Sequence, residues 1–60
     1  MNTPKDILDV KEVATYLSLH PMTVYFLAQS GKIPAAKVGG QWRFRKEVIN
    51  RWLDKHMKGV

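Results

Sequence analysis

A proline at position 21 divides the first half of this chain into two short helical patterns. Asp9, followed three residues later by Glu12, forms a capping pattern that predicts the start of the first helix. Because the residue before a proline avoids helical angles, this helix must end before His20, whereas Pro21 suits the first position of the second helix. Gly31 is placed to end that second helix in a left-handed conformation. Two short helices joined this tightly predict a helix-turn-helix unit.

Apolar residues recur at helical spacing in both patterns, so each predicted helix has one face to bury. Helices this short are not stable alone, so they must share a core with the rest of the chain. Leu19, in the break, is expected to fill the angle between the two helices. The apolar positions are Val10, Val13, Ala14 and Leu17 in the first helix, and Val24, Leu27 and Ala28 in the second, with Tyr25 beside them.

The second half begins with two short runs that have the period of β-strands. These runs, Ala36–Val38 and Gln41–Phe44, are separated by Gly39 and Gly40. Both glycines can take the positive φ that a two-residue hairpin turn requires. Alternation places the two aromatic residues of the second run on one face, and a hairpin this short is stable only if one face packs against helices. Ile7 and Leu8 are expected to add a short extended piece to the core.

A third helix is predicted from about Lys46 to Met57, and it completes a small α+β, mostly α, winged helix-turn-helix fold. Two pairs at i,i+4 spacing, Glu47 with Arg51 and Asp54 with Lys58, are in the favourable order. The buried stripe of this helix is expected to contain Val48, Ile49, Trp52, Leu53 and His56.

With 60 residues and no cysteine, the chain is predicted to be one domain, 1–60, with residues 1–6 flexible and a purely apolar core. The sequence shows no signal peptide and no apolar run of the ~18 residues that a membrane span needs, so a cytoplasmic protein is expected. The large side chains expected in the core are Trp42, Trp52, Phe44, Tyr16 and Tyr25.

Positive charge is concentrated in the second half of the chain. Residues 1–30 carry two lysines against three acidic residues, whereas residues 31–60 carry eight Lys and Arg residues against two acidic ones. Such a field favours a polyanion, first nucleic acid and second an anionic membrane. The apolar residues of the last helix, Trp52 and Leu53, are needed for the core, so a membrane partner is not expected.

A helix-turn-helix followed by a hairpin and a closing helix is typical of winged DNA-binding domains, in which the second helix enters the major groove. Opposite the apolar stripe of that helix lie Met22, Thr23, Phe26 and Gln29. Thr23 and Gln29 can hydrogen-bond to phosphates or bases, whereas Met22 and Phe26 can make only apolar contacts, such as with thymine methyl groups. The alternative is that Met22 and Phe26 are ordinary surface residues or face a protein partner.

The Gly39–Gly40 turn can likewise be a plain turn, or the tip of a wing that lies along phosphates with Lys37, Gln41 and Arg43. Both tryptophans are expected in the core rather than as stacking platforms. His20 is expected to cap or flank the second helix, and two histidines without metal-ligand spacing predict no metal and no cofactor. The sequence offers no nucleophile or acid–base arrangement, so no enzyme is predicted.

Four segments together resemble the excisionase-type helix-turn-helix domain of the MerR-like winged group. They are LDVKEVATYL, HPMTVY, GKIPAAKVGGQWRF and INRWL, and they cover Leu8 to Leu53 in order. The resemblance implies a small DNA-binding protein of site-specific recombination or transcription regulation. It implies DNA contacts at the start of the second helix and in the wing. Together with His20, these candidate residues are Met22, Thr23, Tyr25, Phe26, Lys37, Gly39, Gly40, Gln41 and Arg43.

One departure from the family pattern bears on specificity. Members of the family often carry arginine where this chain has Met22 and Phe26, and serine where it has His20. Met and Phe cannot pair with guanine as arginine does, so the recognition helix has no cationic side chain. The expected partner is double-stranded DNA, bound as a dimer, a cooperative array or together with a recombinase, because one such module makes a small interface. A protein-interaction module that retains the fold is the alternative.

Overall fold

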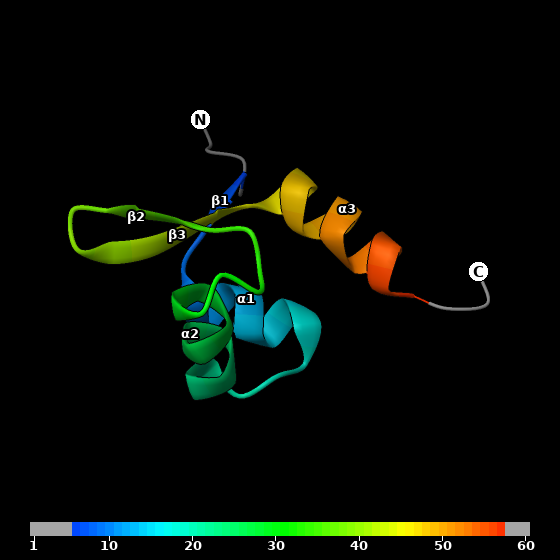
Figure 1. Cartoon of the computed structure of the whole chain (residues 1–60), viewed down its shortest axis with the longest axis horizontal. Helices are drawn as coiled ribbons and strands as arrows, with labels where there is room; N and C mark the ends of the chain where they lie inside the picture. The colour runs from blue at the N-terminus through cyan, green and yellow to red at the C-terminus, as the bar shows by residue number, and fades with distance from the viewer. Residues whose placement is uncertain (1–5, 58–60) are drawn as a thin grey trace.

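A computed structural model describes residues 6–57, and this range forms three helices and a small antiparallel sheet (Figure 1). The first two helices lie together on one side of the sheet, and the third continues directly from the last strand. Residues 1–5, most of the segment expected to be flexible, lie outside the described residues, as do Lys58 and its predicted pairing with Asp54. The elements in chain order are β1 (Ile7–Leu8), α1 (Val10–Leu17), α2 (Pro21–Gln29), β2 (Ala36–Val38), β3 (Gln41–Arg45) and α3 (Lys46–His56).

The predicted capping of α1 is confirmed. The Glu12 amide donates to Asp9 Oδ1 at 2.8 Å, and the Asp9 amide donates to Glu12 Oε1 at 2.9 Å, which satisfies two free amides of the first turn reciprocally. The helix ends at Ser18, which takes the left-handed conformation with φ +59°. Leu19 does not fill the angle between the helices as expected. It is 38% exposed, because Val13, Ala14, Val24 and Ala28 already fill that contact.

The sheet contains one strand more than the predicted hairpin. Its strand order is β1-β3-β2, and all pairs are antiparallel, so β3 is the central strand. Ile7 pairs with Arg45 and Leu8 with Phe44, which joins the start of the described chain to the end of the hairpin. Gly39 and Gly40 have φ of +58° and +82°, as the two-residue turn requires.

The core lies between the inner face of the sheet and the helices. Phe44, Ile49, Val13 and Val24 are its largest fully buried side chains. Two of the expected core aromatics are on the surface instead: Tyr16 is 45% exposed and Tyr25 is 42% exposed. Their hydroxyls can remain hydrated there, and the Tyr16 hydroxyl donates to the side chain of Asn50.

The two tryptophans are half-buried against the core and hold α3 and the hairpin in place. Trp52 Nε1 donates to the Lys32 carbonyl at 3.1 Å, which fastens α3 to the connector after α2. The predicted Glu47–Arg51 pair is formed at 3.5 Å on the solvent side of α3. His56 was expected in the buried stripe of α3, but it is exposed and packs on the Trp52 ring at 4.5 Å between centroids.

Candidate nucleic-acid interface

Two residues that were predicted to start α2 occupy its start in the structure. Pro21 occupies the first turn, and His20 is the N-cap residue with extended backbone angles. The Met22 amide donates to His20 Nδ1 at 3.1 Å. Because Nδ1 accepts this bond, the other ring nitrogen is left as the donor at the exposed entry to the helix. The expectation that His20 caps α2 is therefore confirmed.

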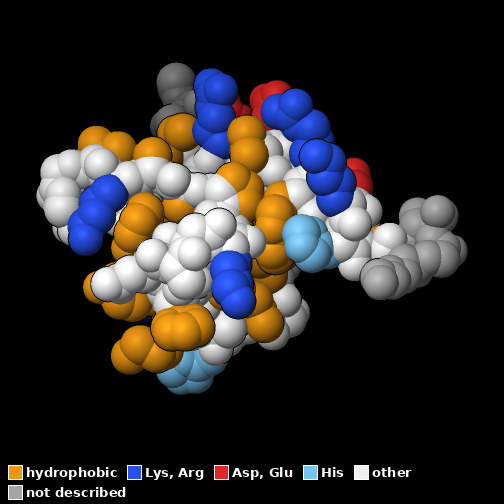
Figure 2. Space-filling model, viewed as in Figure 1, with side chains coloured by type: hydrophobic (Ala, Val, Ile, Leu, Met, Phe, Trp, Pro, Cys, Tyr) orange, Lys and Arg blue, Asp and Glu red, His pale blue; other side chains and the backbone are white. Residues whose placement is uncertain are grey.

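The outer face of α2 is apolar and carries no charge. Met22 is 67% exposed and Phe26 is 65% exposed, and the helix Pro21–Gln29 contains no Lys, Arg, Asp or Glu. The two side chains are four positions apart and so lie on one face of the helix, where they form an exposed apolar patch rather than scattered apolar residues. Figure 2 shows hydrophobic side chains gathered over α2 at the lower left of the molecule.

The wing, defined as β2, the Gly39–Gly40 turn and β3, has the opposite character. The two-residue turn pairs Lys37 with Trp42, and the Lys37 Nζ atom lies 5.3 Å from the centroid of the Trp42 ring. Arg43 is on the other face, where it donates to Gln41 Oε1 at 2.8 Å and to the Trp42 carbonyl at 3.2 Å. The two predicted wing cations therefore point to opposite faces of the ribbon, with the exposed glycine tip between them.

A shallow hollow joins the wing to α2. Tyr25 lines it from the helix, whereas Gly40, Gln41 and Arg43 line it from the wing, so the structure brings these predicted site residues together. Thr23 is placed elsewhere: it is two positions from Tyr25, or about 200° around the helix, and so lies on the flank away from this hollow. We call this depression the α2–wing hollow.

Sequence reasoning missed Lys11, whose exposed side chain lines the α2–wing hollow from the first turn of α1. Asp9 is beside it, but its Oδ1 atom is already bonded to the Glu12 amide. The sequence contains only an indirect signal for the position of Lys11. The cap at Asp9 determines where α1 starts, and the packing of α1 on β3 then brings the first turn of α1 to the wing. That packing cannot be read from a local pattern.

The remaining cations of the described residues are Lys32 in the connector after α2, Arg45 at the end of β3, and three on α3, namely Lys46, Arg51 and Lys55. Figure 2 shows Lys and Arg side chains at the hairpin, over α3 and in the lower centre of the molecule. Within residues 6–57 there is no group of three or more His, Asp and Glu side chains placed to hold a metal ion. No helix in the same range is long and apolar enough to cross a membrane. The candidate site therefore consists of the uncharged helix α2, the wing with a cation on each face, and the hollow that both elements line.

Comparison with known proteins gives two findings. The family model described as "Helix-turn-helix domain" matches residues 7–57. Two relatives, from two strains of Mycobacterium tuberculosis, each carry the name "Putative DNA-binding protein" and are 35% identical to this chain over 48 residues. The match covers 80% of this chain but 62% of each relative, so the chain spans less than two thirds of their length. No solved structure matches.

Proposed function

Because the chain belongs to the helix-turn-helix domain family, we propose that it binds duplex DNA, with α2 in the major groove and the wing on the phosphate backbone or the minor groove. The observation that carries the proposal is the α2–wing hollow, because it puts Tyr25 beside Gly40 and Arg43. One duplex can then lie across the helix and the ribbon together. The names of the two relatives support the same partner.

Affinity in this proposal comes from the wing and the flanking lysines rather than from α2. Each phosphate that a cation neutralises changes the slope of log affinity against log salt by about −0.9. Lys37 and Arg43, on opposite faces of the ribbon, can reach the two phosphate walls of one groove. Met22 and Phe26 contribute apolar contacts to base edges, for which the thymine methyl group is the matching feature.

The proposed biological role is that of the excisionase and MerR-like groups, which is site-specific recombination or transcription regulation. One module of this size buries roughly 600–1,000 Å² of its own surface on DNA, less than most specific complexes bury. We therefore expect the protein to act as a dimer, as a cooperative array or beside a recombinase. Binding, rather than catalysis, is the proposed activity.

The deciding experiment is selection of bound duplexes from a random pool, followed by titration of the best duplex at two salt concentrations. We expect a selected motif and a binding constant that falls steeply with salt. NMR shifts are expected in α2 and the wing, at Tyr25, Gly40 and Arg43 among others. Absence of binding at low salt, or shifts confined to α3, would refute the proposal.

A second candidate function rests on one observation, the exposure of Met22 and Phe26 at 67% and 65%. Apolar and aromatic side chains are favoured at the centres of protein interfaces. If α2 binds a protein instead of DNA, Arg43→Ala should leave that binding unchanged, because Arg43 lies on the wing. If α2 binds DNA, the same substitution should weaken binding. A binding partner that requires α2 and ignores Arg43 would favour this second function.

A further inference from the structure

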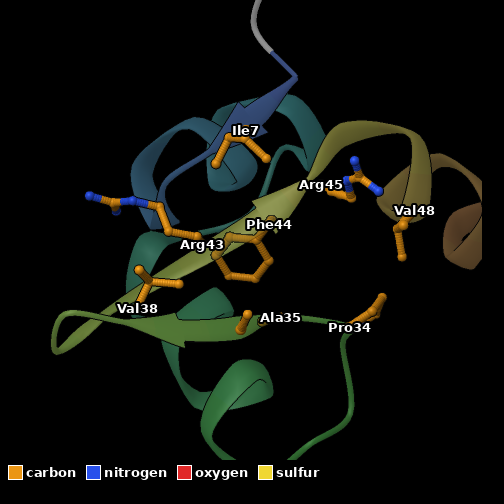
Figure 3. Close-up of a pocket in the computed structure, with 9 residues that line it drawn as sticks. Ile7, Pro34, Ala35, Val38, Arg43, Phe44, Arg45 and Val48 are labelled. Carbon is orange, nitrogen blue, oxygen red and sulfur yellow. The ribbon is translucent and has the colours of Figure 1, made fainter.

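The face of the sheet that turns away from the core carries an apolar groove. The antiparallel register puts Ile7 beside Arg45, and Val38 beside Gln41, on one face, because Leu8, Phe44 and Trp42 occupy the inner face. Figure 3 shows Ile7 on one side of β3 and Val38 and Ala35 on the other, with Pro34 and Val48 at the end nearest α3. We call this depression the outer groove.

The outer groove is lined by apolar side chains that the domain leaves uncovered. Ile7 is 51% exposed and Val38 is 59% exposed, whereas Phe44, whose side chain belongs to the inner face and is 1% exposed, only closes the bottom of the groove. The groove holds about 560 Å³, which falls in the range of roughly 300–1,000 Å³ that is typical of ligand-binding clefts. A contiguous apolar hollow of this kind indicates a contact site more strongly than scattered apolar residues do.

The charged groups that line the outer groove are both positive. Arg43 and Arg45 project from β3 at different places along it, as Figure 3 shows. Within residues 6–57 neither arginine has a carboxylate within ion-pair distance. Arg43 is held by Gln41 Oε1 and the Trp42 carbonyl, both neutral acceptors. The guanidinium groups can therefore each donate hydrogen bonds to a carboxylate from outside the domain.

We propose that the outer groove binds an acidic, amphipathic segment of a partner protein, with apolar side chains packed on Ile7 and Val38 and carboxylates on Arg43 and Arg45. Duplex DNA fits this groove poorly, because its backbone offers no apolar group to fill the floor. A second copy of the chain would bring a further net charge of +5 against the two arginines. The proposal stands on this face of the sheet and does not require that α2 binds DNA.

The position of Arg43 adds a consequence for regulation. Arg43 lines both the outer groove and the α2–wing hollow. A carboxylate that binds this guanidinium competes with a phosphate for it, so a bound acidic segment should lower affinity for DNA. Arg45 lines the outer groove but not the α2–wing hollow. A substitution at Arg45 can therefore test partner binding separately from DNA binding.

The test uses two libraries of displayed 12-residue peptides, one alternating apolar residues with Asp and Glu, and a matched one with Lys and Arg in place of the acids. We expect enrichment from the acidic library only. A synthetic peptide made from an enriched sequence should then shift the amide signals of Ile7, Val38, Phe44 and Arg45 in the labelled full chain. Equal enrichment from both libraries, or shifts confined to α2, would overturn the proposal.

Variants give an independent check with a matched control. Arg45→Ala should weaken peptide binding about fivefold, the effect of one exposed ion pair, while Arg51→Ala removes the same charge from α3 and should change nothing. Val38→Thr keeps the β-branched shape but replaces a methyl group by a hydroxyl, so it should also weaken peptide binding. Equal effects of Arg45→Ala and Arg51→Ala would overturn the proposal, since affinity would then follow net charge. Sedimentation that shows the free chain associating through Val38 would also overturn it, because the occupant would be a second copy.

Discussion

Helix α2 and the wing line one hollow but differ in charge. Helix α2 has no charged residue and exposes Met22 and Phe26, whereas the wing carries Lys37 and Arg43 on either side of two glycines. A cation attracts phosphates of any sequence, and an apolar side chain distinguishes only base edges that offer a methyl group. Under the proposed function, the wing therefore supplies the affinity for DNA and α2 supplies a limited sequence preference.

The largest predicted effect tests whether the two regions share one core. Phe44→Ala removes the 1% exposed ring under the wing and should cost about 3–5 kcal/mol of unfolding free energy, enough to unfold a domain this small. Phe26→Ala makes the same change on the 65% exposed face of α2 and should cost less than about 0.5 kcal/mol. Urea unfolding followed by circular dichroism measures both. If α2 remained helical in the Phe44 variant, the two regions would be independent.

The next prediction sharpens the assignment of affinity to the wing. Arg43→Ala should weaken binding to all duplexes about tenfold and make the salt slope less steep by about one unit. Arg51→Ala is the control, since it removes the same charge from α3, where Glu47 pairs with it. Fluorescence anisotropy titrations at two salt concentrations give both quantities. A loss confined to one sequence would instead assign base reading to the wing.

The turn provides a third test, through backbone geometry alone. Gly40 has φ of +82° and open space around it, so Gly40→Ala meets no neighbour and acts only through its backbone. We expect about 1–2 kcal/mol of destabilisation from the left-handed conformation. Gly40→Asn should cost less, because asparagine tolerates this region. Thermal unfolding of the two variants measures the difference in stability. Equal losses of stability would show that the left-handed conformation at position 40 is not the cause.

The smallest predicted effect isolates the apolar face of α2. Replacing one contacted thymine by uracil in a selected duplex removes a single methyl group, which should weaken binding about fourfold, the value of ~0.8 kcal/mol for one buried methylene-sized group. In the Phe26→Ala variant the same replacement should have a smaller effect at the base that Phe26 contacts. A titration matrix of two duplexes and two proteins gives this coupling. If the losses of binding free energy from the uracil replacement and from Phe26→Ala were additive at every thymine, Phe26 would not contact a thymine methyl group.

Local signals in the sequence predicted the elements well. The Asp9–Glu12 capping box, the helix start at Pro21 and the hairpin at Gly39–Gly40 each depend on residues within four positions of one another. Such patterns work because the backbone bonds they satisfy are themselves local. A two-residue turn also fixes the strand register, and with it the placement of Lys37 and Arg43 on opposite faces of the hairpin.

Contacts between distant segments were harder to predict. The pairing of Ile7 with Arg45 and the approach of Lys11 to the wing depend on how α1 packs against β3, and no local pattern encodes that. The exposure of Tyr16 and Tyr25 was mispredicted, because large aromatic residues were assigned to the core by size. A tyrosine hydroxyl needs a hydrogen-bond partner, and water supplies one at the surface. The assignment of the DNA-contacting residues stays a prediction.

The pairing of β1 with the end of β3 also determines when this domain can form during synthesis. Leu8 finds its partner only when Phe44 has been made, and the inner face of the sheet is incomplete until then. The two short helices between them cannot persist by themselves. The native state of this domain therefore becomes accessible only after residues 8–44 have all left the ribosome, and a nascent chain stalled before residue 44 should remain unfolded and open to proteases.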